Sequence, residues 1–102
     1  MVTARIPFDR DVWMSHGAAH DKPYPRRFMA DELIQNDALK GLTKAQVSEM
    51  LGDPGNHGYF VDYDLVYWLG PERITFGIDS EWLAITIDKK TGRVEGYRIL
   101  TD

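Results

Sequence analysis

The sequence predicts an α+β protein in which two short helices pack on a three-stranded antiparallel meander as a two-layer sandwich, with an irregular N-terminal extension. Three observations predict it: start and stop signals for a helix at residues 43–52, a strand-like segment at 81–88 whose alternate aliphatic residues share one face, and a tight-turn sequence at 88–92. Helical segments followed by a run of strands are typical of α+β domains.

Residues 1–27 form the least regular part of the chain, because proline and glycine interrupt short polar and apolar pieces. We expect this stretch to be an irregular extension packed on the body, with Val12-Trp13-Met14 as an extended anchor. Since 102 residues support one hydrophobic core, residues 28–102 are expected to form a single domain.

The first helix is predicted from about Pro25 to Asp37. Acidic residues lie early in this stretch, where the helix dipole favours negative charge. Its apolar residues share one face at helical spacing: Met29, Ala30, Leu33 and Ile34.

The second helix carries the clearest local signals. Thr43 is a favourable N-cap, and Gln46 three residues later completes a capping box. Gly52 and Pro54 are typical of a helix end. The apolar stripe between these signals is Val47, Met50 and Leu51.

The second half of the chain is predicted to be strands. The first covers residues 64–69, which are rich in strand-forming residues and are followed by Gly70-Pro71. The second covers residues 81–88. Alternation places Leu83, Ile85 and Ile87 on one face, and we expect the helices to cover it.

A hairpin is predicted to join the last two strands, with Gly92 at the turn position that needs a positive φ. The apolar residues of the last strand, residues 93–100, do not keep one phase. A bulge near Gly96 or burial of both faces would explain this. The two phases are Val94 with Leu100, and Tyr97 with Ile99.

Composition and charge argue against several classes of protein. The net charge of −4 argues against a general nucleic-acid binder, which normally has a basic face. No apolar run approaches the roughly 18 residues that a membrane span needs. The chain has no cysteine, and therefore no disulfide, thiolate nucleophile or lipid-attachment site. We expect no cofactor, no nucleic-acid partner and no membrane span.

The chain contains a set of motifs that occur together: Gly41-Leu42-Thr43 with Val47, Leu51-Gly52 and Pro54, then Tyr67-Trp68-Leu69-Gly70, Trp82-Leu83-Ala84-Ile85 and Gly92-Arg93-Val94. Taken together, these motifs resemble the SmpA/OmlA family, which includes the outer-membrane assembly lipoprotein BamE. The resemblance covers about residues 28–100. It implies a BamE-like ααβββ layout, which the repeats of β-lactamase inhibitor protein (BLIP) share.

The resemblance further implies a bacterial, non-enzymatic envelope protein that acts by binding another protein. The anchoring cysteine of the lipoprotein members has no counterpart here. The expected location is therefore the periplasm or the outer-membrane periphery if an export signal has been removed, and the cytoplasm otherwise.

Aromatic residues are the best candidates for a partner-binding surface, because tryptophan and tyrosine are enriched at binding hot spots. Alternation lets Trp68 and Trp82 share the sheet face away from the helices. Either that face is an open interface, or the N-terminal extension covers it through Trp13 or Phe8. The candidate partner-binding residues are Tyr67, Trp68, Trp82 and the acidic neighbour Glu81.

Two further surfaces and one enzymatic alternative stay open. The loop at residues 53–62 could bind a partner, and a three-stranded sheet leaves edges for self-association. The alternative is a small metal-dependent or hydrolytic enzyme built on the histidines and nearby carboxylates such as Asp21. His16 and His20 have a spacing that could bind zinc, but Gly17 and Pro23 favour a loop. The third histidine is His57.

Overall fold

Helices precede strands along the chain, as the sequence predicts. The computed structural model describes residues 5–15, 20–55, 58, 60–73 and 79–102. Its elements are α1 (Arg10–Met14), α3 (Pro25–Gln35), α4 (Lys44–Leu51), β1 (Leu65–Pro71), β2 (Ser80–Ile87) and β3 (Val94–Thr101).

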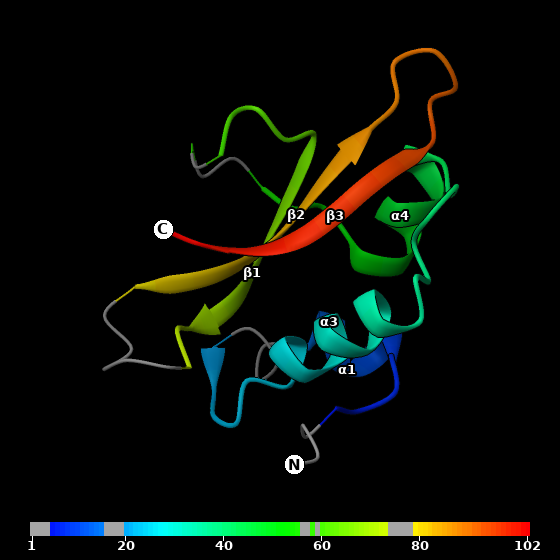
Figure 1. Cartoon of the computed structure of the whole chain (residues 1–102). Helices are drawn as coiled ribbons and strands as arrows, with labels where there is room; N and C mark the ends of the chain where they lie inside the picture. Colours follow the sequence, from blue (N-terminus) through cyan, green and yellow to red (C-terminus); the bar gives the residue numbers. More distant parts are fainter. Residues whose placement is uncertain (1–4, 16–19, 56–57, 59, 74–78) are drawn as a thin grey trace.

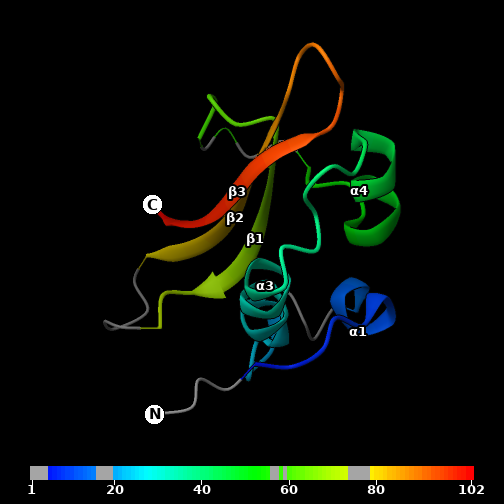
Figure 2. The same cartoon turned by 45° about the vertical axis from the view of Figure 1, so that its right-hand side comes forward.

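The elements form two layers. The strands make an antiparallel sheet in the order β1-β2-β3, and the helices lie on one side of it (Figures 1 and 2). Helix α3 packs against both β1 and β3, while α1 contacts α3 and α4. The predicted α+β layout is therefore confirmed.

Helix α4 begins and ends where its capping residues predict. The Thr43 hydroxyl accepts from the Gln46 N–H at 3.2 Å, and the Gln46 side chain accepts from the Thr43 N–H at 2.8 Å. Gly52 then takes φ +80°, which a residue with a side chain rarely adopts. The capping box predicted from the sequence is thus present.

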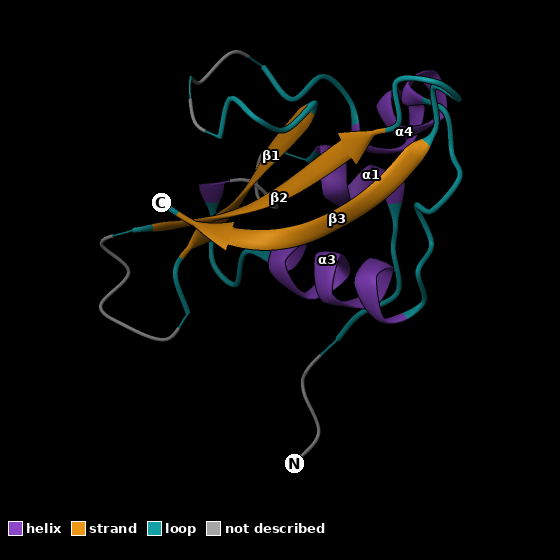
Figure 3. Ribbon diagram, turned by 45° about the horizontal axis from the view of Figure 1, so that its top comes forward, coloured by secondary structure: helices purple, strands orange, loops and turns teal. Residues whose placement is uncertain are grey.

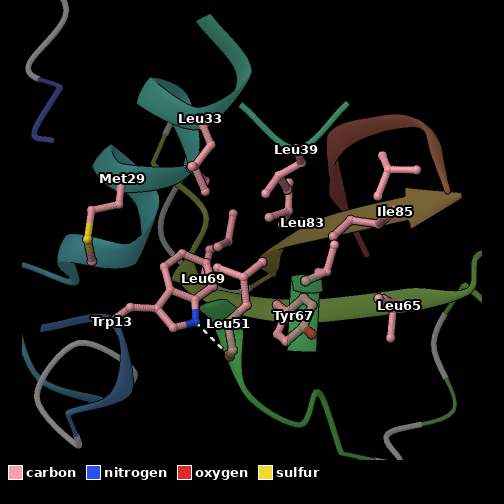
Figure 4. Close-up of a cluster of buried hydrophobic side chains, with 13 residues drawn as sticks. Trp13, Met29, Leu33, Leu39, Leu51, Leu65, Tyr67, Leu69, Leu83 and Ile85 are labelled. Carbon is pink, nitrogen blue, oxygen red and sulfur yellow. Dashed lines mark hydrogen bonds between the residues drawn. The ribbon is translucent and has the colours of Figure 1, made fainter. Parts of the chain in front are cut away.

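The N-terminal extension is more regular than expected. Val12, Trp13 and Met14 lie in helix α1 rather than in an extended anchor, because the Asp9 side chain caps this short helix by accepting from the Val12 N–H. Trp13 is fully buried, and its indole N–H donates to the Leu51 carbonyl at 3.0 Å (Figure 4). The extension therefore contributes to the same core as residues 28–102.

Alternation along the strands assigns the two faces of the sheet. Leu83 and Ile85 are fully buried beneath the helices, and Ile87 is half-buried beside them, as predicted. Thr86 pairs with Gly96 and Ile87 pairs with Val94, so Glu95 is the extra residue of a bulge in β3. This bulge turns Val94, Tyr97 and Ile99 toward the helices, while Leu100 packs on the other face.

The hairpin between β2 and β3 closes with Gly92 at φ +71°, as predicted. The Gly92 N–H donates to the Asp88 carbonyl at 2.8 Å, and the Asp88 side chain accepts from the backbone N–H groups of Lys90 and Thr91. A single aspartate therefore holds the turn.

Two tyrosine hydroxyls tie the layers together. The Tyr67 hydroxyl donates to the Gly52 carbonyl at 2.8 Å, just after α4. The Tyr97 hydroxyl accepts from the Leu39 N–H at 3.1 Å and lies 3.0 Å from an Asp37 carboxylate oxygen. Burial is the main cause that raises the pKa of each tyrosine to about 12.

Replacing Trp13 with alanine should destabilise the whole protein, because it empties a fully buried site and leaves the Leu51 carbonyl without its donor. We expect the free energy of unfolding in urea to fall by about 3–5 kcal/mol. Val12→Ala in the same helix is the control, since Val12 is 38% exposed. Equal losses for the two variants would contradict a shared core.

The tyrosine pKa values predict alkaline destabilisation. The folded protein holds both phenolic protons up to a pH of about 12, whereas the unfolded chain releases them near 10.0. Stability is therefore intact below pH 10 and falls between pH 10 and 12, by up to about 1.4 kcal/mol per pH unit for the buried Tyr67 and by less for Tyr97, whose charge solvent screens more. Urea unfolding at a series of alkaline pH values should show a shallower decline for Tyr67→Phe; an unchanged slope would contradict the assignment.

Candidate functional site

Trp68 and Trp82 lie directly opposite each other on the sheet face that the helices leave free, as predicted. Trp82 is only 6% exposed, and its indole N–H donates to the Asp102 carboxylate at 3.1 Å. The Phe60 ring meets the Trp82 ring with centroids 6.4 Å apart. Trp82 is therefore part of a second hydrophobic cluster rather than an open contact residue.

Trp68 is half-buried, and its cover comes from the N-terminal extension. The His20 ring stacks on Trp68 with centroids 5.6 Å apart, and the Tyr24 ring meets it edge-on at 6.3 Å. Phe8 and Trp13, the expected covering residues, pack instead in the cluster beneath the helices. The extension covers part of this face, but through different residues from those expected.

Tyr67 and Glu81 do not form a surface with the two tryptophans. Tyr67 is 1% exposed and points toward the helices, where its ring lies edge-on to Trp13. Glu81 is 5% exposed. It shares the parity of Leu83 along β2, so its side chain also points toward the helix layer. The prediction that Glu81 is an exposed acidic residue for binding a partner is therefore wrong, because its side chain is buried.

A partly buried charge cluster explains how Glu81 is accommodated. Arg73, just after β1, lies 2.8 Å from a Glu81 carboxylate oxygen and 2.7 Å from an Asp31 carboxylate oxygen of α3. Burial alone would lower the pKa of the Arg73 guanidinium, but the hydrogen bonds to Asp31 and Glu81 raise it on balance. The cluster fastens the end of the β1–β2 hairpin to α3, and the parity of Glu81 with Leu83 was the sequence signal for it.

The histidines are not brought together as a metal site among the residues that the structure describes. His20 is the only one of the three in those ranges, and its ring is stacked on Trp68. His16 and His57 lie outside the described residues. Within residues 5–15, 20–55, 58, 60–73 and 79–102, no group of three His, Asp or Glu side chains could hold a metal ion.

The outer edge of β1 is partly occupied by arginine side chains. The Arg26 guanidinium donates to the Trp68 carbonyl at 3.2 Å and, through Nε, to the Trp13 carbonyl at 2.8 Å. The Arg27 guanidinium donates to the Pro71 carbonyl at 3.1 Å. These contacts close part of this edge to a further strand.

The outer edge of β3 is different, because most of it is open. The Asp102 N–H donates to the Ser80 carbonyl of β2 at 3.2 Å. Backbone direction alternates along a strand, so Leu100, Arg98 and Gly96 also point their N–H and C=O groups toward β2. The alternate residues, Tyr97, Ile99 and Thr101, point theirs away from the sheet. In the part of the chain that the structure describes, these outward N–H and C=O groups make no hydrogen bond.

The side chains along this edge combine charge with half-buried apolar surface. Ile99 lies on the helix side and Leu100 on the other side, both half-buried, while Arg98 and Thr101 are exposed. The Arg98 side chain makes no ion pair or hydrogen bond among the described residues. A shallow hollow beside the edge is lined by Asp62, Tyr63, Thr86, Glu95, Gly96, Tyr97 and Arg98.

Removing the arginine of this cluster should be costly, since Asp31 and Glu81 then lose the guanidinium that pairs with both of them. For Arg73→Leu we expect the free energy of unfolding in urea to fall by about 2–4 kcal/mol, below the usual range for a fully buried ion pair because Arg73 is 26% exposed. Adding Asp31→Asn and Glu81→Gln to this variant should recover part of the loss. A triple variant no more stable than Arg73→Leu would contradict the charge argument.

No protein-family model, curated protein sequence or solved structure matches this chain. Among the described residues, no helix has the length and apolar character needed to cross a membrane.

Proposed function

We propose that this protein is a non-enzymatic protein-interaction module that binds an extended segment of a partner protein along the outer edge of β3. The observation that carries the proposal is the row of outward backbone donors and acceptors at Tyr97, Ile99 and Thr101 without partners in the described structure. An added strand would pair with these groups, as in other domains that recognise peptides by strand addition.

The other surfaces offer less to a partner. Tyr67, Trp82 and Glu81 are buried, and Trp68 is partly covered by His20 and Tyr24. The loop at residues 53–62 places Phe60 against Trp82, so at least that residue serves the second cluster. The edge of β3 combines free backbone groups with accessible side chains of mixed character.

The family resemblance supports the same class of function. The helix from Thr43 to Gly52 and the tryptophan-bearing strands resemble the SmpA/OmlA, BamE-like family, for which binding to another protein is implied. If an export signal precedes the chain, the resemblance also implies a location in the bacterial envelope. A metal-dependent or hydrolytic function has no comparable support, since His20 stacks on Trp68 and the other two histidines lie outside the described residues.

The edge can be tested at Thr101, whose N–H points outward and whose side chain is exposed. Thr101→Pro removes that donor without breaking a bond to β2, because proline is tolerated where the N–H faces solvent. The probe is a random peptide library displayed on phage and selected on the native protein. We expect selected peptides to bind Thr101→Pro at least about tenfold more weakly than the native protein. The peptide carbonyl that accepts from the Thr101 N–H would be buried in the complex without a donor.

Thr101→Val is the matched control, because it alters the same side chain but keeps the N–H; its affinity for the peptides should stay close to that of the native protein. Circular dichroism would verify that both variants are folded. Failure to select any peptide, or selected peptides that bind Thr101→Pro as tightly as the native protein, would contradict the proposal.

A further inference from the structure

We propose that the strand which occupies the edge of β3 is β3 of a second copy of this chain, paired antiparallel about a two-fold axis at Ile99. This inference rests on the proposed function, since it identifies the partner that the open edge receives. The result would be a continuous sheet across two molecules. Figure 3 shows β3 as the outermost strand on its side of the sheet.

The first part of β3 limits where a second strand can lie. The Val94 N–H donates to the Leu42 carbonyl at 2.7 Å, and the Gly41 N–H donates to the Val94 carbonyl at 3.1 Å. Thr43 also pairs with Arg93 as an isolated bridge. The segment before α4 therefore occupies the outer edge up to Val94, and only the stretch from Gly96 onward can receive a strand.

This limit selects among the possible two-fold registers. An axis at Arg98 would place Asp102 of the second copy against Val94, where Leu42 is already bound. The same register would set the two Arg98 side chains against each other, and directly opposed like charges are destabilising. Among the described residues, an axis at Leu100 would pair only residues 98–102 and would leave the outward backbone groups of Tyr97 without a described partner.

An axis at Ile99 pairs the largest number of described residues while avoiding the segment before α4. Residues 96–102 of the two copies then run side by side, with Gly96 opposite Asp102. The outward backbone groups of Tyr97 meet those of Thr101 in the second copy, and the groups of Ile99 meet their own counterparts. Every outward backbone group identified on the open edge thereby gains a partner.

Charge and apolar surface also agree with this register. Arg98 would lie opposite Leu100, and its diagonal neighbours in the second copy would be Asp102 and Arg98. The long Arg98 side chain reaches the Asp102 carboxylate and can turn away from the other arginine. Arg98 has no ion pair in the described part of the chain, so the contact would satisfy it. The half-buried Ile99 and Leu100 would be covered further, which adds apolar burial to the strand pairing.

Sedimentation velocity of the native chain over a concentration series is the first test. We expect a monomer–dimer equilibrium, with Thr101→Val dimerising as the native chain does. Thr101→Pro should dimerise at least about tenfold more weakly, because by symmetry the substitution removes two intermolecular hydrogen bonds. A native chain that stays monomeric at every concentration would overturn the inference. If that monomer still bound selected peptides, the proposed function would stand without it.

Single cysteines test the register, since the native chain has none. With the axis at Ile99, the two Ile99→Cys residues face each other at a Cα separation of about 5.5 Å, within the range of a disulfide. Residues 98 and 100 lie diagonal to their own counterparts, at about 7–8 Å. Under mild oxidation, Ile99→Cys should give a covalent dimer, and Arg98→Cys and Leu100→Cys should not. Efficient cross-linking at residue 98 or 100 instead would overturn the register.

Discussion

The burial of β2 on both of its faces is the constraint on which the rest of the structure depends. Leu83 and Ile85 are covered by the helices, while Trp82 and Ala84 need a cover on the opposite side. A central strand of this kind cannot leave either face to water, because alternation would expose a row of large apolar side chains. The helix layer covers the first of these faces, and Phe60, Tyr63 and Leu100 pack on the second.

The bulge at Glu95 divides β3 into two parts with different surroundings. Before it, the backbone of Val94 is bound by Gly41 and Leu42; beyond it, the outward groups have no described partner. The same extra residue brings Val94, Tyr97 and Ile99 onto the helix side, which fixes the corner between α3 and α4 through the Tyr97 hydroxyl. A local irregularity therefore both completes the core and defines the open edge.

Sequence reasoning succeeded where local chemistry decides the structure and failed where distant segments meet. The Thr43 capping box and the core parity of Leu83 depend on neighbouring residues, and both were predicted; the bulge near Gly96 was one of two alternatives that the phase change in the last strand left open. Helix α1 was missed because five residues show no helical period, and Glu81 was misjudged because its charge outweighed its parity with Leu83. That a sheet edge would be open was predictable, but not which one, since this depends on side chains and loops far away in the sequence.

The difference between the two sheet edges determines whether strand addition between molecules stops at a dimer or continues. Strand addition at both edges would propagate without limit and favour aggregation. Here β1 has carbonyl groups bound by Arg26 and Arg27, whereas the far part of β3 is open. Pairing of β3 with its own copy uses the same edge of both molecules, so it closes after two chains. An arrangement with one covered and one open edge can therefore provide specific association while limiting the growth of longer assemblies.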